Sequence, residues 1–310
     1  MALPGIISIS RRGDIPAFHT PWLMKRLREG YCYFQTPYGG KIQHVSLGPE
    51  DCEGLVFWTR NPYPLFKHID ELKDRGYYFY FHFTITGYPK PLESHTPPLL
   101  KSIDRFKYLS EKIGPDSVHW RYDPVVLSNL TPEAFHIDNF SFIADNLKGS
   151  SKICTISFLQ FYKKSRANFT KINQQLGVRL EESAVERKIR MAQALRKIAS
   201  DNGFKLRSCC DSSLLEAGIS KGSCIGPEYL SLIRTDFHDN WKKRPTRKGC
   251  ACIESVDIGT YETCTFGCCY CYATRGRETA LKNLKNYHKN DPILVRPKRY
   301  MGVDLSSVNI

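Results

Sequence analysis

The run YYFYFHFTIT (77–86), the run PLLKSIDRFKYLSEKIG (98–114) that follows it, and the run SVHWRYDPVV (117–126) decide the fold. The first and third are rich in aromatic and β-branched residues, which is typical of strands. The middle run spaces its apolar residues three or four apart and ends in glycine, which is typical of a helix. A helix between two strands joins parallel strands by a crossover, so this stretch predicts one βαβ unit.

The same alternation extends in both directions along the chain. Further strands are predicted at GIISIS (5–10), LVFWT (55–59), ICTISFLQF (153–161), KLRSC (205–209) and ESVDIGTY (254–261). Helical patterns lie between most of them, at 21–30, 64–76, 132–147 and 181–203. Seven strands alternating with helices predict an α/β protein with a full or partial TIM-barrel-like (β/α) fold. We expect a main body over 1–208, a cysteine-rich region over 209–275 that completes the barrel, and a basic tail over 276–310.

Composition narrows the class of protein. The chain has 310 residues, of which 41% are hydrophobic, and no apolar run approaches the roughly 18 residues of a membrane span. Its start, MALPGIISISRRGD, has neither the charged region nor the long apolar region of a signal peptide. We therefore expect a soluble cytoplasmic protein with no membrane partner. The net charge of +14 favours an anionic partner such as nucleic acid, although a solvated basic surface explains it equally well.

Cysteine placement points to metal chemistry. A reducing cytosol leaves thiols free for ligation or catalysis, and nine of the twelve cysteines lie after residue 208. Cys264, Cys268 and Cys271 stand within eight residues, after a predicted strand. Three close thiolates suit a four-iron cluster that keeps one iron free of protein ligands. Cys269 falls outside this spacing. A structural zinc site is the alternative, but it favours paired CxxC units or Cys/His mixtures, and no histidine lies beside this loop.

The CxxxCxxC spacing, with an aromatic residue before the third cysteine, resembles the signature of the radical S-adenosylmethionine superfamily. The resemblance implies that Cys264, Cys268 and Cys271 bind a 4Fe-4S cluster. In that superfamily the open iron binds S-adenosylmethionine, whose reductive cleavage yields a 5′-deoxyadenosyl radical. It further implies an electron donor such as flavodoxin or ferredoxin, and cofactor contacts from the neighbouring Tyr270 and Tyr272.

Over almost its whole length the chain is also similar to a bacterial family known as domain of unknown function 1848. The shared segments are SISRRGDIPAF (8–18), FWTRNP (57–62), WRYDP (120–124) and DIGTYETCTFGCCYCYA (257–273). That family has a C-terminal cysteine cluster similar to the radical-enzyme loop, and no assigned reaction. The YCYA ending of the loop also resembles spore photoproduct lyase and its relatives, which repair DNA, and this makes nucleic acid or a nucleotide a candidate substrate.

The position of the loop departs from the superfamily pattern. Usual members carry the loop after their first strand and a GGE-like segment after the second, and no GGE occurs here. If the barrel is circularly permuted, the strand at 254–261 lies beside the N-terminal strand at 5–10. The cofactor would then be bound by residues that follow this N-terminal strand, namely Ser10, Arg11, Arg12 and Asp14. A structural ion pair between Arg12 and Asp14 is the alternative.

Other charged residues lie within or directly after predicted strands, where an unpaired charge is costly and a functional cluster is favoured. The candidates for catalytic roles are Arg12, Asp14, Arg60, Arg121 and Asp123.

A second group of cysteines precedes the loop. Cys250 and Cys252 form a CxC pair, which together with Cys224 and either Cys209 or Cys210 would supply four thiolates. Such a set would hold an auxiliary iron–sulfur cluster or a structural zinc ion. The alternative is that some of these cysteines are small buried side chains.

Three functions remain compatible with these patterns. The first is a radical S-adenosylmethionine enzyme that acts on an unknown substrate. The second is a non-catalytic nucleic-acid-binding protein that contains iron–sulfur or zinc and grips phosphates with its basic tail. The third is a redox protein that carries a cluster without turning over S-adenosylmethionine.

Overall fold

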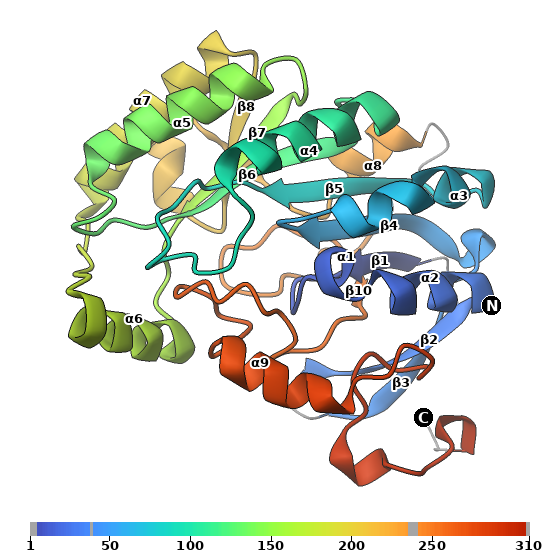
Figure 1. Ribbon diagram of the computed structural model, residues 1–310. Coiled ribbons are helices and arrows are strands. Elements are labelled where there is room, and N and C mark those ends of the chain that lie inside the picture. The colour runs from blue at the N-terminus through green and yellow to red at the C-terminus, as the bar shows by residue number, and fades with distance from the viewer. Residues whose placement is uncertain (1–4, 38–39, 235–240, 308–310) are drawn as a thin grey trace.

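An eight-stranded parallel sheet forms the centre of the molecule in the computed structural model, which describes residues 5–37, 40–234 and 241–307 (Figure 1). The strand order is β10-β1-β4-β5-β6-β7-β8-β9, and every neighbouring pair is parallel. The strands are β1 (Gly5–Ile9), β4 (Cys52–Thr59), β5 (Phe79–Thr84), β6 (Val118–Val125), β7 (Ile153–Phe158), β8 (Lys205–Cys209), β9 (Ser220–Gly222) and β10 (Val256–Asp257).

The predicted α/β architecture is confirmed, and all seven predicted strands are present. A closed TIM barrel is not confirmed, because within the described residues β10 and β9 form the two open edges of the sheet. These edges contain only two and three residues. The run predicted as a strand at 254–261 is extended only at Val256–Asp257, since it then turns into the cysteine loop.

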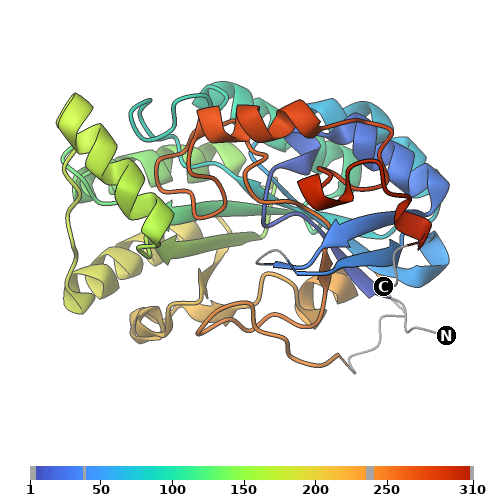
Figure 2. The same cartoon turned by 90° about the horizontal axis from the view of Figure 1, so that it is seen from below.

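Helices cover one face of the sheet, as Figure 2 shows. They are α1 (Ile15–Phe18), α2 (Thr20–Glu29), α3 (Ile69–Asp74), α4 (Leu99–Ile113), α5 (Glu133–Leu147) and α7 (Val185–Asp201). Aromatic pairs join the two layers. The rings of Phe83 and Phe106 lie 5.4 Å apart, and those of Trp120 and Phe140 lie 4.6 Å apart. Because alternate residues of a strand face opposite sides, this layer buries Phe81, Phe83 and Trp120 and turns His82 and Arg121 to the other side.

The opposite face is covered by the segment that follows β9, drawn in yellow to orange in Figure 2. Its helix α8 (Pro227–Ile233) contributes Tyr229 and Leu230 to a buried cluster with Ile6, Val56 and Tyr80 of the sheet. Both faces of the sheet are therefore buried, as is usual for parallel strands. This explains why β5 reads as an almost continuous apolar run and not as an alternating one.

Several elements were not predicted. They are α1, the antiparallel strands β2 (Tyr31–Gln35) and β3 (Ile42–Ser46), α6 (Lys163–Leu176), α8, β9, and α9 (Arg277–Asn283). The region expected as a basic tail is packed against the body. Ile293 and Leu305 are buried against the hairpin, and the Trp22 indole donates to the Asp291 carbonyl at 2.8 Å. No helix among the described residues is long and apolar enough to cross a membrane.

Candidate functional site

Strand β10 leads directly into the cysteine loop and pairs with β1. Ile7 lies opposite Val256 and Ser8 opposite Asp257, and the pairing is parallel. The predicted adjacency of the first strand and the strand before the cysteine loop is therefore confirmed. Parallel strands end at the same edge of a sheet, so the residues after β1 and the cysteine loop meet there.

The cysteine loop is fastened to the connection that follows β5. Cys269 donates its backbone N–H to the Leu92 carbonyl at 3.0 Å, and His95 donates to the Phe266 carbonyl at 3.0 Å. Gly267 has a φ of +72°, and a Cβ at this position would lie 2.5 Å from the Ser94 hydroxyl. Only glycine fits both the left-handed backbone and this close approach, so Gly267 sets the path of the chain between the first and second cysteines.

The three cysteines of the predicted motif, which we call the loop thiols, lie together. Cys264, Cys268 and Cys271 are partly exposed, and each is close enough to at least one of the others to influence its charge. The Ala273 amide donates to the Cys271 thiol at 3.3 Å. Burial raises the pKa of Cys268 to about 12, while the nearby Arg60 guanidinium opposes that rise. Cys269 instead belongs to the hydrophobic core, in agreement with its place outside the motif.

A buried ion pair lies beside the loop thiols. Arg60, at the end of β4, places Nη1 at 2.9 Å from a carboxylate oxygen of Glu93. The Tyr270 and Thr86 hydroxyls donate to the same oxygen, and Arg60 also donates to the Tyr270 hydroxyl. The Tyr270 side chain is therefore engaged in this buried network, next to the second loop thiol. The network fixes one wall of the loop and holds a positive charge close to it.

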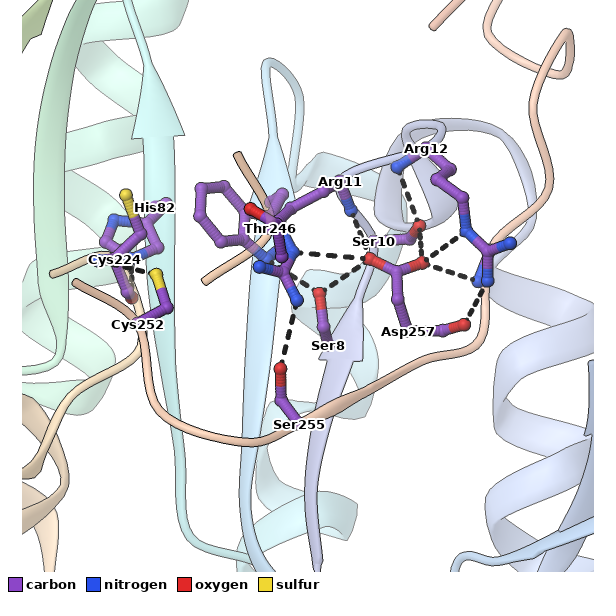
Figure 3. A network of polar contacts seen from close by, with 12 residues as sticks. Ser8, Ser10, Arg11, Arg12, His82, Cys224, Thr246, Cys252, Ser255 and Asp257 are labelled. Atoms are coloured by element: carbon purple, nitrogen blue, oxygen red, sulfur yellow. Dashed lines mark hydrogen bonds and ion pairs between the residues drawn. The ribbon is translucent and has the colours of Figure 1, made fainter. Parts of the chain in front are cut away.

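Asp257 is the centre of a second network, shown in Figure 3. Its carboxylate accepts hydrogen bonds from Ser8 at 2.8 Å, from Ser10 at 2.6 Å and from the Arg11 amide at 2.8 Å. Arg12 donates from Nε at 3.1 Å and also pairs with the Asp257 backbone carbonyl. Burial alone would raise the pKa of Asp257, but the charges of Arg12 and Arg11 outweigh burial and lower it.

The predicted cofactor contacts therefore have protein partners. Arg12 is paired with Asp257 and not with Asp14, so the alternative of an Arg12–Asp14 ion pair is wrong. Asp14 caps helix α1, accepting from the Ala17 amide, and it also accepts from the Thr59 hydroxyl and the Arg60 amide at 2.7 Å each. Burial raises the pKa of Asp14 to about 6. Of the residues after β1, Arg11 retains an unpartnered buried nitrogen, Nη1.

Arg121 and Asp123 lie at the end of β6, on the face of the sheet opposite the helices. Their side chains form an ion pair, and Ser157 donates to the Asp123 carboxylate. The Arg121 guanidinium lies 5.2 Å from the centre of the Trp58 ring, and that of Arg11 lies 5.9 Å from it. Arg121 also donates to the Cys224 thiol at 3.1 Å. These contacts connect the residues after β1 with the second group of cysteines.

The second group contains one cysteine more than the predicted set of four. We call it the interior thiols, and its members are Cys209, Cys210, Cys224, Cys250 and Cys252. Cys209 lies 3.7 Å from Cys210 and 3.3 Å from Cys224, measured between sulfur atoms. Cys209 and Cys210, between which the sequence left the fourth ligand open, both lie in this group.

The donor set of the loop thiols suits iron–sulfur chemistry. Within the described residues, no three Cys, His, Asp or Glu side chains surround one point as a single bound ion would require. A four-iron cluster makes a different demand, because each thiolate ligand binds a separate iron. The loop offers three thiols, an amide directed at Cys271, and the nearby cations Arg60 and Lys164, which suit an anionic cluster with one open iron.

Some residues of the site escaped prediction from the sequence. Glu93 lies in an irregular connection and carries no motif. Lys164, on helix α6, forms an ion pair with Glu262 at 2.7 Å and donates to the Ala273 carbonyl at the end of the loop. Asp257 lies within a predicted strand, and the predicted pairing of that strand with the one that precedes Arg11 and Arg12 was the available signal. Cys210 was named only as an alternative.

Tyr272 connects the two cysteine groups through side-chain contacts. Its hydroxyl donates to the Arg11 carbonyl at 2.7 Å, and its ring centre lies 5.6 Å from that of Tyr162. Arg247 donates to the Tyr162 hydroxyl at 3.0 Å and to the Cys209 thiol at 3.6 Å. A chain of contacts thus leads from the residue beside Cys271 to the interior thiols.

Comparison with known proteins gives a family and no activity. The sequence pattern of the family described as "Domain of unknown function (DUF1848)" matches residues 6–273, which include both cysteine groups and all of the sheet except Gly5. No curated protein matches the chain. The chain belongs to the DUF1848 family.

Proposed function

We propose that the protein is a radical S-adenosylmethionine enzyme whose 4Fe-4S cluster is held by Cys264, Cys268 and Cys271. The observation that carries the proposal is the position of these thiols at the carboxyl-end edge of a parallel sheet, beside the strand β1. In α/β folds of this kind, ligands bind where the strands end. We further propose that the open sheet is a partial barrel of circularly permuted order, because the strand that leads into the loop is last in the chain and pairs with the first.

When bound, the cluster would supply the electron that cleaves S-adenosylmethionine to a 5′-deoxyadenosyl radical. The chain's own part is binding, orientation and shielding from water. Arg60 and Lys164 stabilise negative charge at the loop thiols, and the ion pair with Glu93 keeps Arg60 in place. Arg11 directs its free Nη1 from the edge of β1, where it would bind a carboxylate of the cofactor or substrate.

Some of the remaining predicted residues would hold the chain after β1 in place, and others would contact the substrate. Arg12, Ser10 and Asp14 orient the chain after β1, since each is held by Asp257, Thr59 or backbone amides. Arg121 and Asp123 line the same side of the sheet as Arg11, and we place the unknown substrate between them and the cluster. A soluble electron carrier such as flavodoxin or ferredoxin would deliver electrons in the cytoplasm.

The decisive experiment is anaerobic. The protein is reconstituted with iron and sulfide, dithionite and S-adenosylmethionine are added, and 5′-deoxyadenosine is measured by mass spectrometry. We expect 5′-deoxyadenosine from the wild-type protein and none above background from Cys268→Ala. A cluster that forms without yielding 5′-deoxyadenosine would refute the enzyme and favour the redox protein.

A second candidate function is nucleic-acid binding, and a groove on the helical side of the molecule favours it. The groove has a volume of about 1370 Å³ and lies between α2, the 3-10 helix Tyr63–His68 and α4. It is lined by the exposed aromatic rings Tyr63 and Tyr108 and by seven basic side chains against three acidic ones. The basic side chains are Lys25, Arg28, Lys67, Lys101, Arg105, Lys112 and Lys289, and the acidic ones are Glu29, Asp70 and Asp104. Stacking surfaces beside basic side chains are how proteins bind single strands without sequence preference.

This candidate is tested by titrating a fluorescent single-stranded oligonucleotide at several salt concentrations. If the groove binds phosphates, affinity falls steeply as salt increases and the variant Lys67→Glu/Lys101→Glu binds more weakly. Lys197→Glu/Lys205→Glu, which carries the same charge change outside the groove, is the matched control. Equal losses in both variants would show that the groove is not the binding surface.

A further inference from the structure

The interior thiols form a closed ring of contacts. Cys209 contacts Cys210 and Cys224, at the distances given above. The Cys224 amide donates to the Cys252 thiol at 3.3 Å, and the Cys252 amide donates to the Cys250 thiol at 3.4 Å. The Cys210 and Cys250 side chains interact with each other, so the five cysteines form one ring. The cysteines come from three separate segments, at 209–210, 224 and 250–252, so the ring is a product of the tertiary fold.

The ring is enclosed and faces cations. Cys209, Cys224 and Cys252 are at most 6% exposed. Arg121 donates to the Cys224 thiol at 3.1 Å, and Arg247 donates to the Cys209 thiol at 3.6 Å. Guanidinium groups that donate to sulfur stabilise thiolate, the form that binds metal. Neutral packing cysteines would not require two arginines directed at them.

Unpartnered polar atoms lie on the neighbouring strands β5, β6 and β7. His82 donates through Nε2 to the Cys224 carbonyl at 2.6 Å, while its Nδ1 has no partner (Figure 3). Both ring nitrogens of His119, beside His82 on the next strand, and the Thr155 hydroxyl, beside Arg121, also lack partners. These side chains are at most 2% exposed. A buried polar group without a partner is costly, so the free Nδ1 of His82, whose Nε2 is held by the Cys224 backbone, points to a bound polar group beside the interior thiols.

We propose that the interior thiols bind a second metal centre, an iron–sulfur cluster. Four thiolates complete the ligand set of a 4Fe-4S cluster, and the fifth lies beside them. The centre would lie between the ends of β6 and β8 and the segment after β9, on the face of the sheet opposite the helices. The contact chain through Arg247, Tyr162 and Tyr272 joins the two centres. This inference does not rest on the reaction proposed above.

The test counts metal in a protein that lacks the loop thiols. The variant Cys264→Ala/Cys268→Ala/Cys271→Ala is reconstituted anaerobically, and iron and acid-labile sulfide per chain are measured together with the electron paramagnetic resonance of the reduced sample. We expect about eight irons per chain in the wild type and about four in this variant, since each cluster holds four. Iron in the variant at background level, or zinc without sulfide, would overturn the proposal.

A second step assigns the remaining iron to the ring. Adding Cys224→Ala and Cys252→Ala to the triple variant should remove the remaining iron and its spectrum. Adding Cys32→Ala and Cys154→Ala, which are buried cysteines outside both groups, is the matched control and should leave about four irons. Equal iron in the two five-site variants would overturn the assignment. Arg121→Gln, which keeps all thiols, should shift the spectrum of the second centre alone.

The two proposals fail separately. Cys224→Ala/Cys252→Ala in the otherwise wild-type chain keeps the loop thiols, so it should keep about four irons and their reaction with S-adenosylmethionine. If the loop thiols do not bind a cluster, Cys224→Ala/Cys252→Ala will contain no iron. If the interior thiols do not bind one, Cys264→Ala/Cys268→Ala/Cys271→Ala will contain no iron.

Discussion

The loop thiols and the interior thiols differ in how the chain brings them together. The loop thiols occupy one turn of chain, and a single glycine with φ of +72° sets their path. The interior thiols meet only because β8, the segment after β9 and the segment before β10 converge on one face of the sheet. A short sequence motif is therefore enough to identify the loop thiols, whereas the interior thiols depend on the whole arrangement of strands. A substitution in the loop should disturb the loop thiols and leave the interior thiols in place.

The largest effect that separates the two groups is loss of a loop ligand. Cys268→Ala should reduce 5′-deoxyadenosine formation by more than about 100-fold, because removing a ligand costs more than removing a residue that merely supports one. Cys269→Ala, one residue away in the hydrophobic core, should keep the reaction at an appreciable rate. Mass spectrometry of the anaerobic reaction checks both. Similar losses in the two variants would mean that the adjacent cysteine also binds the cluster.

Breaking the ion pair beside the loop should give the next largest effect. Arg60→Met leaves the Glu93 carboxylate buried without its cation and should lower the free energy of unfolding by about 3–5 kcal/mol. Arg28→Met breaks an Arg–Glu pair of 2.7 Å at the surface, and it should cost about 1 kcal/mol or less. Urea unfolding measures both. If the two costs are equal, the buried pair does not support the loop.

A smaller effect should follow from a change in the loop backbone. Gly267→Ala places a Cβ in a left-handed conformation and against the Ser94 hydroxyl, so it should cost about 1–3 kcal/mol. The control Gly276→Ala has open space around its Cβ position. In the variant that lacks only Gly267, the interior thiols should keep their metal while the loop loses affinity. Iron analysis and urea unfolding distinguish this from a general loss of structure.

His136, which lies outside both cysteine groups, should make the free energy of unfolding depend on pH. His136 is buried against Tyr122 and the Val126 carbonyl, and burial lowers its pKa from 6.5 to about 4. Below pH 6.5 the unfolded chain binds a proton that the folded chain does not, so stability falls as pH falls toward 4. The share of His136 is about 1 kcal/mol between pH 6.5 and 5.5. His136→Gln should flatten the pH dependence of unfolding by that amount, and an unchanged slope would contradict the assignment.

Much of the fold could be predicted from the sequence because its signals are local. Apolar runs located all seven predicted strands, and Gly114 and Gly30 end the helices that were expected to stop near them. The hairpin over residues 31–46 was missed since its strands are short and partly polar. Helix α6 was missed because its surface is mostly polar and only Ser165 and Phe169 are buried. The sheet stays open at the edge strands β10 and β9, which have two and three residues and are too short for hydrophobic periodicity to reveal.

The residues of the candidate site also divide into those that a local sequence signal marks and those that none marks. The loop thiols and Arg60 were found because a motif or a strand end marks them. Glu93 and Lys164 were missed because they reach the loop from an irregular connection and from a helix that carries no signal. The alternative of an ion pair between Arg12 and Asp14 was wrong, because Asp257, 245 residues from Arg12 in the chain, pairs with Arg12 across the strand pair β1–β10.

The sequence by itself determined the parallel α/β class, the three loop thiols and the position of their motif near the end of the chain. These depend on hydrophobic period and on spacings of a few residues, which the backbone converts directly into local geometry. Only the tertiary structure decided that Asp257 pairs with Arg12, that Arg60 is neutralised by Glu93, and that five cysteines close into one ring. Such contacts join residues far apart in the chain, and burial makes each of them energetically consequential, because a buried charge or polar atom must find its partner wherever the fold places one.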